Sequence, residues 1–255
     1  MAAQPIYQFY AELNDYEPKI WRRFQVSNHI TMARLGYILM TMFEMQASHL
    51  FDFSVPVYEN FCLYTENPCA PEEVGEHWAD DFPFFEGKKN WRFEFAHEDM
   101  MDLCPEDEEL LNVEKEKVKS VVSHAREQMS FYYDYGDDWG ITLTLEEIIR
   151  DKELPGKELP RVLAGAGYGI VENCGGVSGL EEIAKAFQRK KGKAYREFSE
   201  WLGREDLDME KFDIEDINFR LKKIPRIYAD IYEYGLEPTK RSLNLLERKY
   251  QEGKS

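Results

Sequence analysis

The sequence predicts an α+β protein: a mixed β-sheet packed by an N-terminal helix and followed by a helical C-terminal third. Two strand-like segments, 6–13 and 19–26, precede a helical segment directly, unlike the strand–helix alternation of a doubly wound protein. A second strand pair is indicated at 131–145, and from residue 178 onward apolar residues recur at helical spacing. We therefore expect one domain over residues 1–255.

The first elements follow from apolar periodicity. Segments 6–13 and 19–26 are predicted strands joined by a turn, because residues 14–18 (NDYEP) have turn composition. Two further strands are expected at 49–55 and 61–65. Between these pairs, a helix over 31–44 with one buried face is indicated by apolar residues at helical spacing: Met32, Leu35, Leu39, Met42 and Phe43.

Residues 66–118 differ in composition from the rest. Four prolines and an acidic stretch over 98–109 interrupt them, and WRFEF at 91–95 is the piece that resembles a strand. We expect a variable acidic excursion over the surface, with a short helix near 113–122. The acidic stretch is typical of a solvated face, and a docking surface is the alternative.

The second half opens with a hairpin pattern in which Gly136–Asp138 forms the connecting loop. The first strand is expected to place Phe131, Tyr133 and Tyr135 on one face, and the second strand to alternate in the same way from Trp139 onward. A helical region over 178–255 then begins with an S-x-x-E capping box at Ser178, and further helices are expected at three segments: 193–202, 213–223 (before Pro225) and 239–251.

Composition and charge narrow the function classes. With 43% hydrophobic residues and a net charge of −17, the chain is typical of a soluble globular protein that repels nucleic-acid phosphates. Direct nucleic-acid binding is therefore disfavoured, and the acidic surface either suits basic protein partners or serves solubility alone. No apolar run is long enough for a transmembrane helix, and no secretory signal is evident. The four cysteines form no C-x-x-C pair, so a cytoplasmic protein with reduced thiols is expected.

Four sequence blocks occur in an order that is typical of a known family. They are PKIWRRFQV with the helix and SHLFDF that follow it, YYDYGDDW, ENCGG, and LDMEKFDIEDINFRL. In this order the blocks resemble the plasmid pRiA4b open-reading-frame-3-like family, which implies a fold and a site and hints at mobile genetic elements. After the second block the family usually has an acidic residue and then His, whereas Gly140 and Ile141 stand here. If that His is a metal ligand in the family, this chain lacks part of the metal shell.

The first candidate site is the loop of the hairpin. Asp134, Asp137 and Asp138 lie beside Trp139 and offer carboxylates that could bind a hard cation or position a water molecule. Aspartates also form turns by hydrogen-bonding nearby backbone N–H groups, so a structural role is the alternative. If Asp134 is buried, it needs a partner such as Arg22 or Arg161.

The second candidate site is the Glu172–Gly176 block. Gly175 and Gly176 precede a capped helix, where backbone N–H groups favour an anion. Cys174, near the same helix N-terminus, could be a nucleophile with a lowered pKa. The alternative is a tight turn around a small buried cysteine.

His49 is the histidine that falls in one of the family blocks. A His beside apolar residues is more typical of a hydrogen-bonded structural residue than of a ligand. If the fold brings them together, a metal-binding or catalytic set could form from four residues: His49, Asp134, Glu172 and Cys174.

Three functions stay open. The leading hypothesis is a non-enzymatic protein-interaction module, because no complete catalytic set is evident and the surface is acidic. The second is a metal- or thiol-dependent enzyme that uses the Asp134/Cys174 region, with His49 as a further catalytic candidate. The third is an acidic nucleic-acid mimic that binds a DNA-handling protein. The sequence identifies no cofactor.

Overall fold

The fold is built on one mixed β-sheet. The computed structural model describes residues 4–63, 88–95, 105–150 and 158–251. Within these residues eight strands pair in the order β5-β4-β3-β6-β7-β1-β2-β8. Neighbours run antiparallel except β4 and β5, which confirms the predicted mixed sheet. The strands are β1 (Ile6–Leu13), β2 (Trp21–Ser27), β3 (Phe51–Val55), β4 (Asn90–Glu94), β5 (Glu108–Asn112), β6 (Gln128–Tyr133), β7 (Trp139–Ile149) and β8 (Arg161–Ala166).

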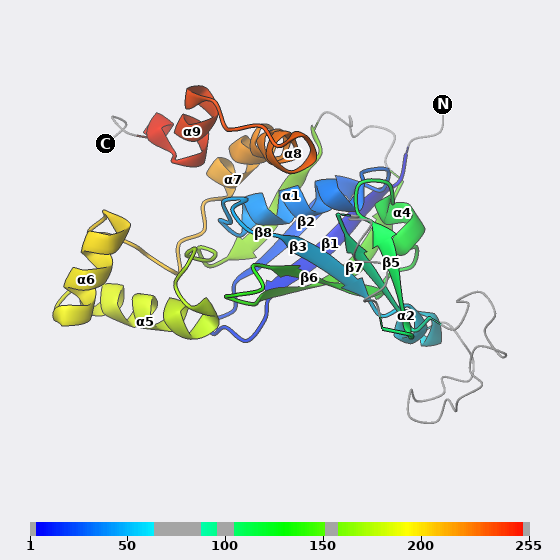
Figure 1. Cartoon of the computed structure of the whole chain (residues 1–255), viewed down its shortest axis with the longest axis horizontal. Helices are drawn as coiled ribbons and strands as arrows, with labels where there is room; N and C mark the ends of the chain where they lie inside the picture. Colours follow the sequence, from blue (N-terminus) through cyan, green and yellow to red (C-terminus); the bar gives the residue numbers. More distant parts are fainter. Residues whose placement is uncertain (1–3, 64–87, 96–104, 151–157, 252–255) are drawn as a thin grey trace.

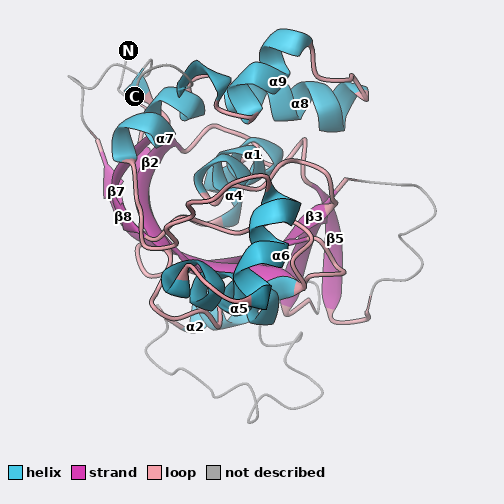
Figure 2. Ribbon diagram, turned by 90° about the vertical axis from the view of Figure 1, so that its left-hand side faces the viewer, coloured by secondary structure: helices cyan, strands magenta, loops and turns pink. Residues whose placement is uncertain are grey.

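The helices pack on and around this sheet (Figure 1). Figure 2 shows the sheet curving around α1, with α7, α8 and α9 on the other side of that helix. None of the helices in the described ranges combines the length and the apolar character that a membrane span requires. The helices are α1 (Met32–Met42), α2 (Val57–Cys62), α4 (Val118–Val121), α5 (Gly176–Arg189), α6 (Lys193–Leu202), α7 (Ile214–Leu221), α8 (Ile224–Tyr234), α9 (Lys240–Leu246) and the 3₁₀ turn η4 (Lys249–Gln251).

Helix α1 is buried on nearly every side, whereas the sequence predicts a single buried face. Thr31 caps the helix, because its hydroxyl accepts a hydrogen bond from the Arg34 N–H at 3.2 Å. Helix α8 packs against the face of α1 that the sheet leaves open. As a result every residue of α1 except Arg34 is buried. Gly36 permits close packing on the sheet: a Cβ there would lie 2.7 Å from the ring of Phe51.

Several predicted elements need correction. The strand expected at 61–65 is wrong within the described residues, because Val57–Cys62 forms helix α2. Strand 91–95 is confirmed as β4, whereas most of the predicted excursion around it lies outside the described residues. Helix α8 is not predicted, because Pro225 is interpreted as a stop signal. In the structure Pro225 lies in the first turn of α8, where the missing N–H leaves no helical bond unmade.

The hairpin is confirmed, but its loop begins earlier than expected. β6 ends at Tyr133, and Asp134 turns the chain with a left-handed φ of 58°. Tyr135 is therefore 53% exposed and does not share the buried face of Tyr133. The capping box at Ser178 is also wrong, since α5 starts two residues earlier with Gly175 as its N-cap.

Candidate metal centre

Three loops bring His49, Asp134 and Glu172 together. His49 precedes β3 and Asp134 follows β6, and these two strands pair antiparallel, so the residues that flank them become neighbours. The Asp134 N–H accordingly donates to the carbonyl of the residue after His49, at 3.0 Å. Glu172 follows β8 in a segment that is held to the end of α1 by a 2.9 Å hydrogen bond from the Ile170 N–H to the Phe43 carbonyl.

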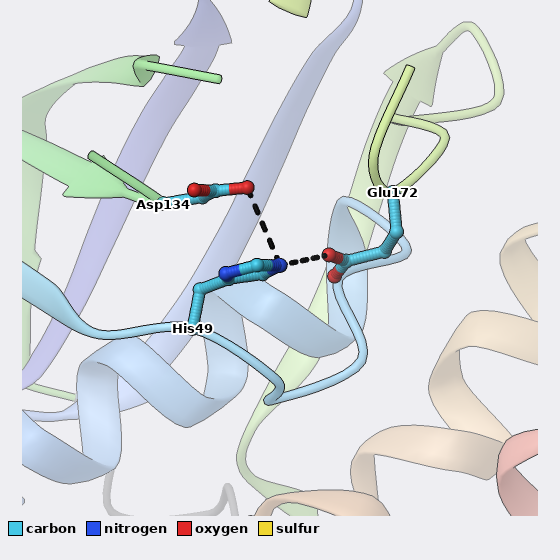
Figure 3. Close-up of side chains that lie close together, drawn as sticks. All are labelled: His49, Asp134 and Glu172. Carbon is cyan, nitrogen blue, oxygen red and sulfur yellow. Dashed lines mark ion pairs between the residues drawn. The ribbon is translucent and has the colours of Figure 1, made fainter. Parts of the chain in front are cut away.

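The three side chains point at a common centre (Figure 3). His49 Nε2 lies 3.3 Å from Asp134 Oδ2 and 3.5 Å from Glu172 Oε2. One ligand atom from each residue lies within 4.8 Å of the other two. Side chains that converge in this way from three separate loops offer one nitrogen and two carboxylate ligands, which suits a divalent metal ion.

Neighbouring groups fix the orientation of the Glu172 carboxylate. Its Oε1 accepts hydrogen bonds from the Gln46 N–H at 2.7 Å and from the Tyr133 hydroxyl at 2.8 Å. The Ser48 hydroxyl donates to Oε2 at 3.2 Å. The two strongest contacts thus hold Oε1 and turn Oε2 toward the imidazole of His49. Outer contacts of this kind are what orient the ligands of a metal site.

The Asp134 carboxylate is oriented in the same manner. Its Oδ1 accepts a hydrogen bond from the Gly136 N–H at 3.0 Å, which leaves Oδ2 facing His49. The predicted arginine partner for Asp134 is therefore replaced by a histidine and a backbone N–H group.

The centre contains two buried carboxylates, whose negative charges require a cation nearby. Asp134 and Glu172 retain 7% and 8% of their accessible surface. His49 Nε2 is also buried, and it makes no hydrogen bond to any residue that the structure describes. Two desolvated carboxylates need a nearby cation. A proton on His49 or a bound metal ion would supply it.

Each of the three turns that carry these side chains contains a residue with a left-handed backbone conformation. The φ angles are 59° at Ala47, 58° at Asp134 and 58° at Asn173. Non-glycine residues in this region are strained by roughly 1–3 kcal/mol each, and such residues cluster at functional sites. The same three turns that carry the strain are those that aim the side chains at one another.

Cys174 is not part of this group, although the sequence places it among the candidate ligands. Its Sγ contacts the carbonyl of Gly176 at 3.5 Å, within its own turn. Burial, followed by the negative charge of Asp137, raises the pKa of the Cys174 thiol to about 12. A protonated thiol is a poor nucleophile and a poor ligand, so the geometry favours the tight-turn alternative for this residue.

Asp137 joins the two candidate blocks. Its Oδ2 accepts a hydrogen bond from the Gly175 N–H at 3.2 Å, so the hairpin loop caps helix α5 from 38 residues away. Gly176 is needed at this contact, because it has a φ of 69° and a Cβ would lie 2.5 Å from the Asp137 carbonyl oxygen. The N–H groups proposed for an anion are thus partly occupied by a carboxylate of the chain itself.

The remaining candidates have structural surroundings. The Asp138 N–H donates to the Asp134 carbonyl at 2.6 Å, which closes the turn, and Trp139 is fully buried in the core. Arg22 is fully buried between the rings of Phe43 and Phe212. Burial lowers the pKa of Arg22 to about 10. Its guanidinium donates to five main-chain carbonyls: those of Trp21, Met42, Ala166, Gly167 and Tyr168.

The sequence pattern does not reveal the groups that surround the ligands. The strand pattern predicts Tyr133 only as a residue of one strand face, and it assigns no role to Ser48. One signal was available: a buried tyrosine hydroxyl requires a hydrogen-bond partner. Spacing along the chain does not identify that partner as Glu172, 39 residues away.

Comparison with known proteins agrees with this fold. The family described as plasmid pRiA4b ORF-3-like protein matches residues 5–218, which is most of the chain. The chain belongs to this family. The pRiA4b ORF-3-like match includes all three residues of the candidate centre. No curated protein matches the sequence.

A solved structure supports the pRiA4b ORF-3-like fold. The crystal structure of a protein of unknown function, MM3350 from Methanosarcina mazei Go1, superposes with a TM-score of 0.61. The two sequences are 22% identical, and the alignment covers 83% of this chain and 97% of that one. At this identity the likeness establishes the fold and assigns no activity.

Proposed function

We propose that the protein binds one divalent metal ion through His49, Asp134 and Glu172 and uses it to activate a water molecule in a hydrolytic reaction. The observation that carries this proposal is the matched orientation of the carboxylates: each has one oxygen held by hydrogen bonds and the other turned toward His49 Nε2. Turn formation by itself does not require two carboxylates to converge on a histidine.

The ligand set narrows the choice of metal. One imidazole nitrogen and two carboxylate oxygens suit Zn²⁺, Mn²⁺ or Fe²⁺ better than Ca²⁺, which prefers a larger number of oxygen ligands. Three protein ligands leave a coordination position for water, as in catalytic sites. Zn²⁺ held by these three residues would lower the pKa of a bound water to about 7 and would thereby supply a nucleophile at neutral pH.

The competing explanation is that protonated His49 alone neutralises the two carboxylates. The two explanations differ in their dependence on added metal. In the metal explanation, Zn²⁺ or Mn²⁺ binds stoichiometrically and raises the melting temperature, because a ligand of the folded state stabilises it. In the protonation explanation, added metal does not bind stoichiometrically and leaves the melting temperature unchanged.

The test is a metal titration of the chelator-treated protein by calorimetry, together with elemental analysis of the untreated protein. Three variants remove one ligand each: His49→Ala, Asp134→Asn and Glu172→Gln. Asp138→Asn is the matched control, because Asp138 is an exposed aspartate in the same turn. We expect one metal per chain in the wild type and in the control, and loss of binding in the three ligand variants. Absence of binding in the wild type, or equal binding in all variants, would refute the proposal.

The interaction-module hypothesis stays a prediction beside this proposal, as do the acidic nucleic-acid mimic and the link to mobile elements. The net charge of −17 supports an acidic surface that attracts basic partners. These hypotheses require partner capture from native lysate, and salt-insensitive binding would exclude the mimic. The interaction module and the nucleic-acid mimic are both compatible with a metal centre in the same chain.

A further inference from the structure

A cavity of about 400 Å³ lies beside helix α5, away from the residues of the candidate metal centre. It is enclosed by the turn between β1 and β2, by one side of α5 and by the segment 207–210. This size falls within the range of small-ligand pockets. Its lining includes Leu207–Glu210, the beginning of the fourth family block, for which the metal centre gives no role.

The floor of the cavity is apolar. Tyr16, Phe187, Leu207 and Met209 line it and retain between 1% and 8% of their accessible surface. A buried apolar floor of this kind favours an aliphatic or aromatic group.

The rim of the cavity is acidic. Among the residues that the structure describes, four carboxylates line it, and Lys185 is the single lining residue with a positive charge. Lys185 is already paired with Glu181 at 2.8 Å, so the remaining charge of the rim is negative. The carboxylates lie close to the floor: after burial, the charges of Glu181 and Glu210 are what raise the pKa of Tyr16. The four carboxylates belong to Glu17, Glu181, Asp208 and Glu210.

We propose that this cavity receives an arginine or lysine side chain from a basic segment of a partner protein. Such a side chain has an aliphatic stem that packs on an apolar floor and a cationic head that remains at the rim. The complementary charges of rim and ligand supply the specificity. The proposal does not depend on metal binding, and the interaction function predicted from the acidic composition gains a defined place in the fold.

The probe is a blocked pentapeptide with one arginine among glycines, titrated into ¹⁵N-labelled full-length protein and followed by NMR. We expect amide shifts to concentrate in residues 16–18, 181–188 and 207–210, and to weaken as salt is added. The double variant Asp208→Asn/Glu210→Gln should bind about tenfold more weakly, as expected for two partly exposed ion pairs. A peptide with norleucine in place of arginine should also bind more weakly, because it keeps the stem and lacks the charge.

Asp206→Asn is the matched control. Asp206 lies in the same loop and pairs with Lys190, outside the cavity. Its removal changes the net charge by one, as each half of the double variant does, and should leave peptide affinity unchanged. The proposal would be overturned by equal weakening in the control, by equal binding of the norleucine peptide, or by shifts that spread over the whole surface. Binding of free spermidine as tight as that of the peptide would also overturn it, because the site would then serve a small polyamine.

Discussion

The hydroxyl of Tyr232, on helix α8, donates a hydrogen bond to the main-chain carbonyl of His49. One turn earlier on the same helix, the Tyr228 hydroxyl donates to the Met45 carbonyl at 2.5 Å. The family match ends at residue 218, so a helix beyond the matched region holds the loop that carries the imidazole. The position of His49 therefore depends on a part of the chain that contributes no ligand.

Tyr232→Phe is expected to weaken metal binding without removing a ligand. Loss of one hydrogen bond costs about 1 kcal/mol. If the whole of this cost falls on the metal-bound conformation of the His49 loop, the metal affinity becomes about fivefold weaker. Calorimetric titration with Zn²⁺ measures the change. Tyr37→Phe is the control, because the Tyr37 ring stacks on Tyr232 at 5.7 Å and its hydroxyl bonds Glu233 instead of the loop. Equal affinities in both variants would show that α8 does not position His49.

Tyr133→Phe tests whether the orientation of Glu172 matters. The variant keeps the buried ring and removes the hydroxyl that holds Oε1 of Glu172 at 2.8 Å. Groups in this position typically contribute roughly 10–100-fold to metal affinity, so a loss in that range is expected. Tyr132→Phe, on the opposite face of β6, should retain wild-type affinity. Unchanged metal affinity in Tyr133→Phe would contradict an orienting role.

Glu44→Gln is expected to destabilise the fold and reduce its acid sensitivity. The Glu44 side chain is 7% exposed and pairs with Arg220 at 2.7 Å and with Arg248 at 2.6 Å. Removing one partner of a buried ion pair costs roughly 3–5 kcal/mol, since the other charges stay buried. Urea unfolding measures the loss. Glu247→Gln, which removes an exposed partner of Lys249, should change stability by less than about 1 kcal/mol.

The pH dependence of the Glu44 effect has a definite sign. Burial by itself raises the pKa of Glu44, but the charges and hydrogen bonds of Arg220 and Arg248 outweigh it, and the pKa falls below the ordinary value of 4.5. Because the folded pKa is lower than the unfolded one, the contribution is present above pH 4.5 and is lost as the pH falls through the folded pKa. Wild-type stability should decline in that acidic window, and that of Glu44→Gln should decline less.

Native Cys174 is expected to resist alkylation. Its pKa is raised to about 12 chiefly by burial, so the thiol stays protonated at pH 8 and lacks the reactive thiolate. Iodoacetamide treatment at pH 8 followed by peptide mass spectrometry should show slow modification in the native protein and fast modification in urea. Rapid native alkylation would restore the nucleophile hypothesis.

The sequence predicts the elements whose residues alternate or recur without interruption. β1 and α6 have the predicted bounds, because each contains an uninterrupted apolar pattern. The sequence does not predict β8, because RVLAGA is rich in small residues: Gly165 faces the ring of Phe212, where a Cβ would lie 2.7 Å away. The beginning of α5 was placed two residues late because its acceptor, Asp137, comes from a distant loop.

The sequence predicts which residues belong to the candidate site, but it does not predict how they are arranged in space. Three of the four candidate ligands converge. The antiparallel pairing of β3 with β6, which brings His49 beside Asp134, is visible only in the fold. The exclusion of Cys174 could not be predicted, because it depends on a side-chain direction that is set within one tight turn.

Helix α5 has a further consequence for communication within the molecule. It begins four residues after Glu172, is tied at its first turn to the hairpin loop by Asp137, and forms one wall of the acidic cavity along its side. The two proposed sites thus share a rigid element. If occupancy of either one shifts α5, thermodynamic reciprocity requires that metal change peptide affinity by the same factor by which peptide changes metal affinity. A single pair of titrations, each with the other ligand saturating, would measure that factor twice.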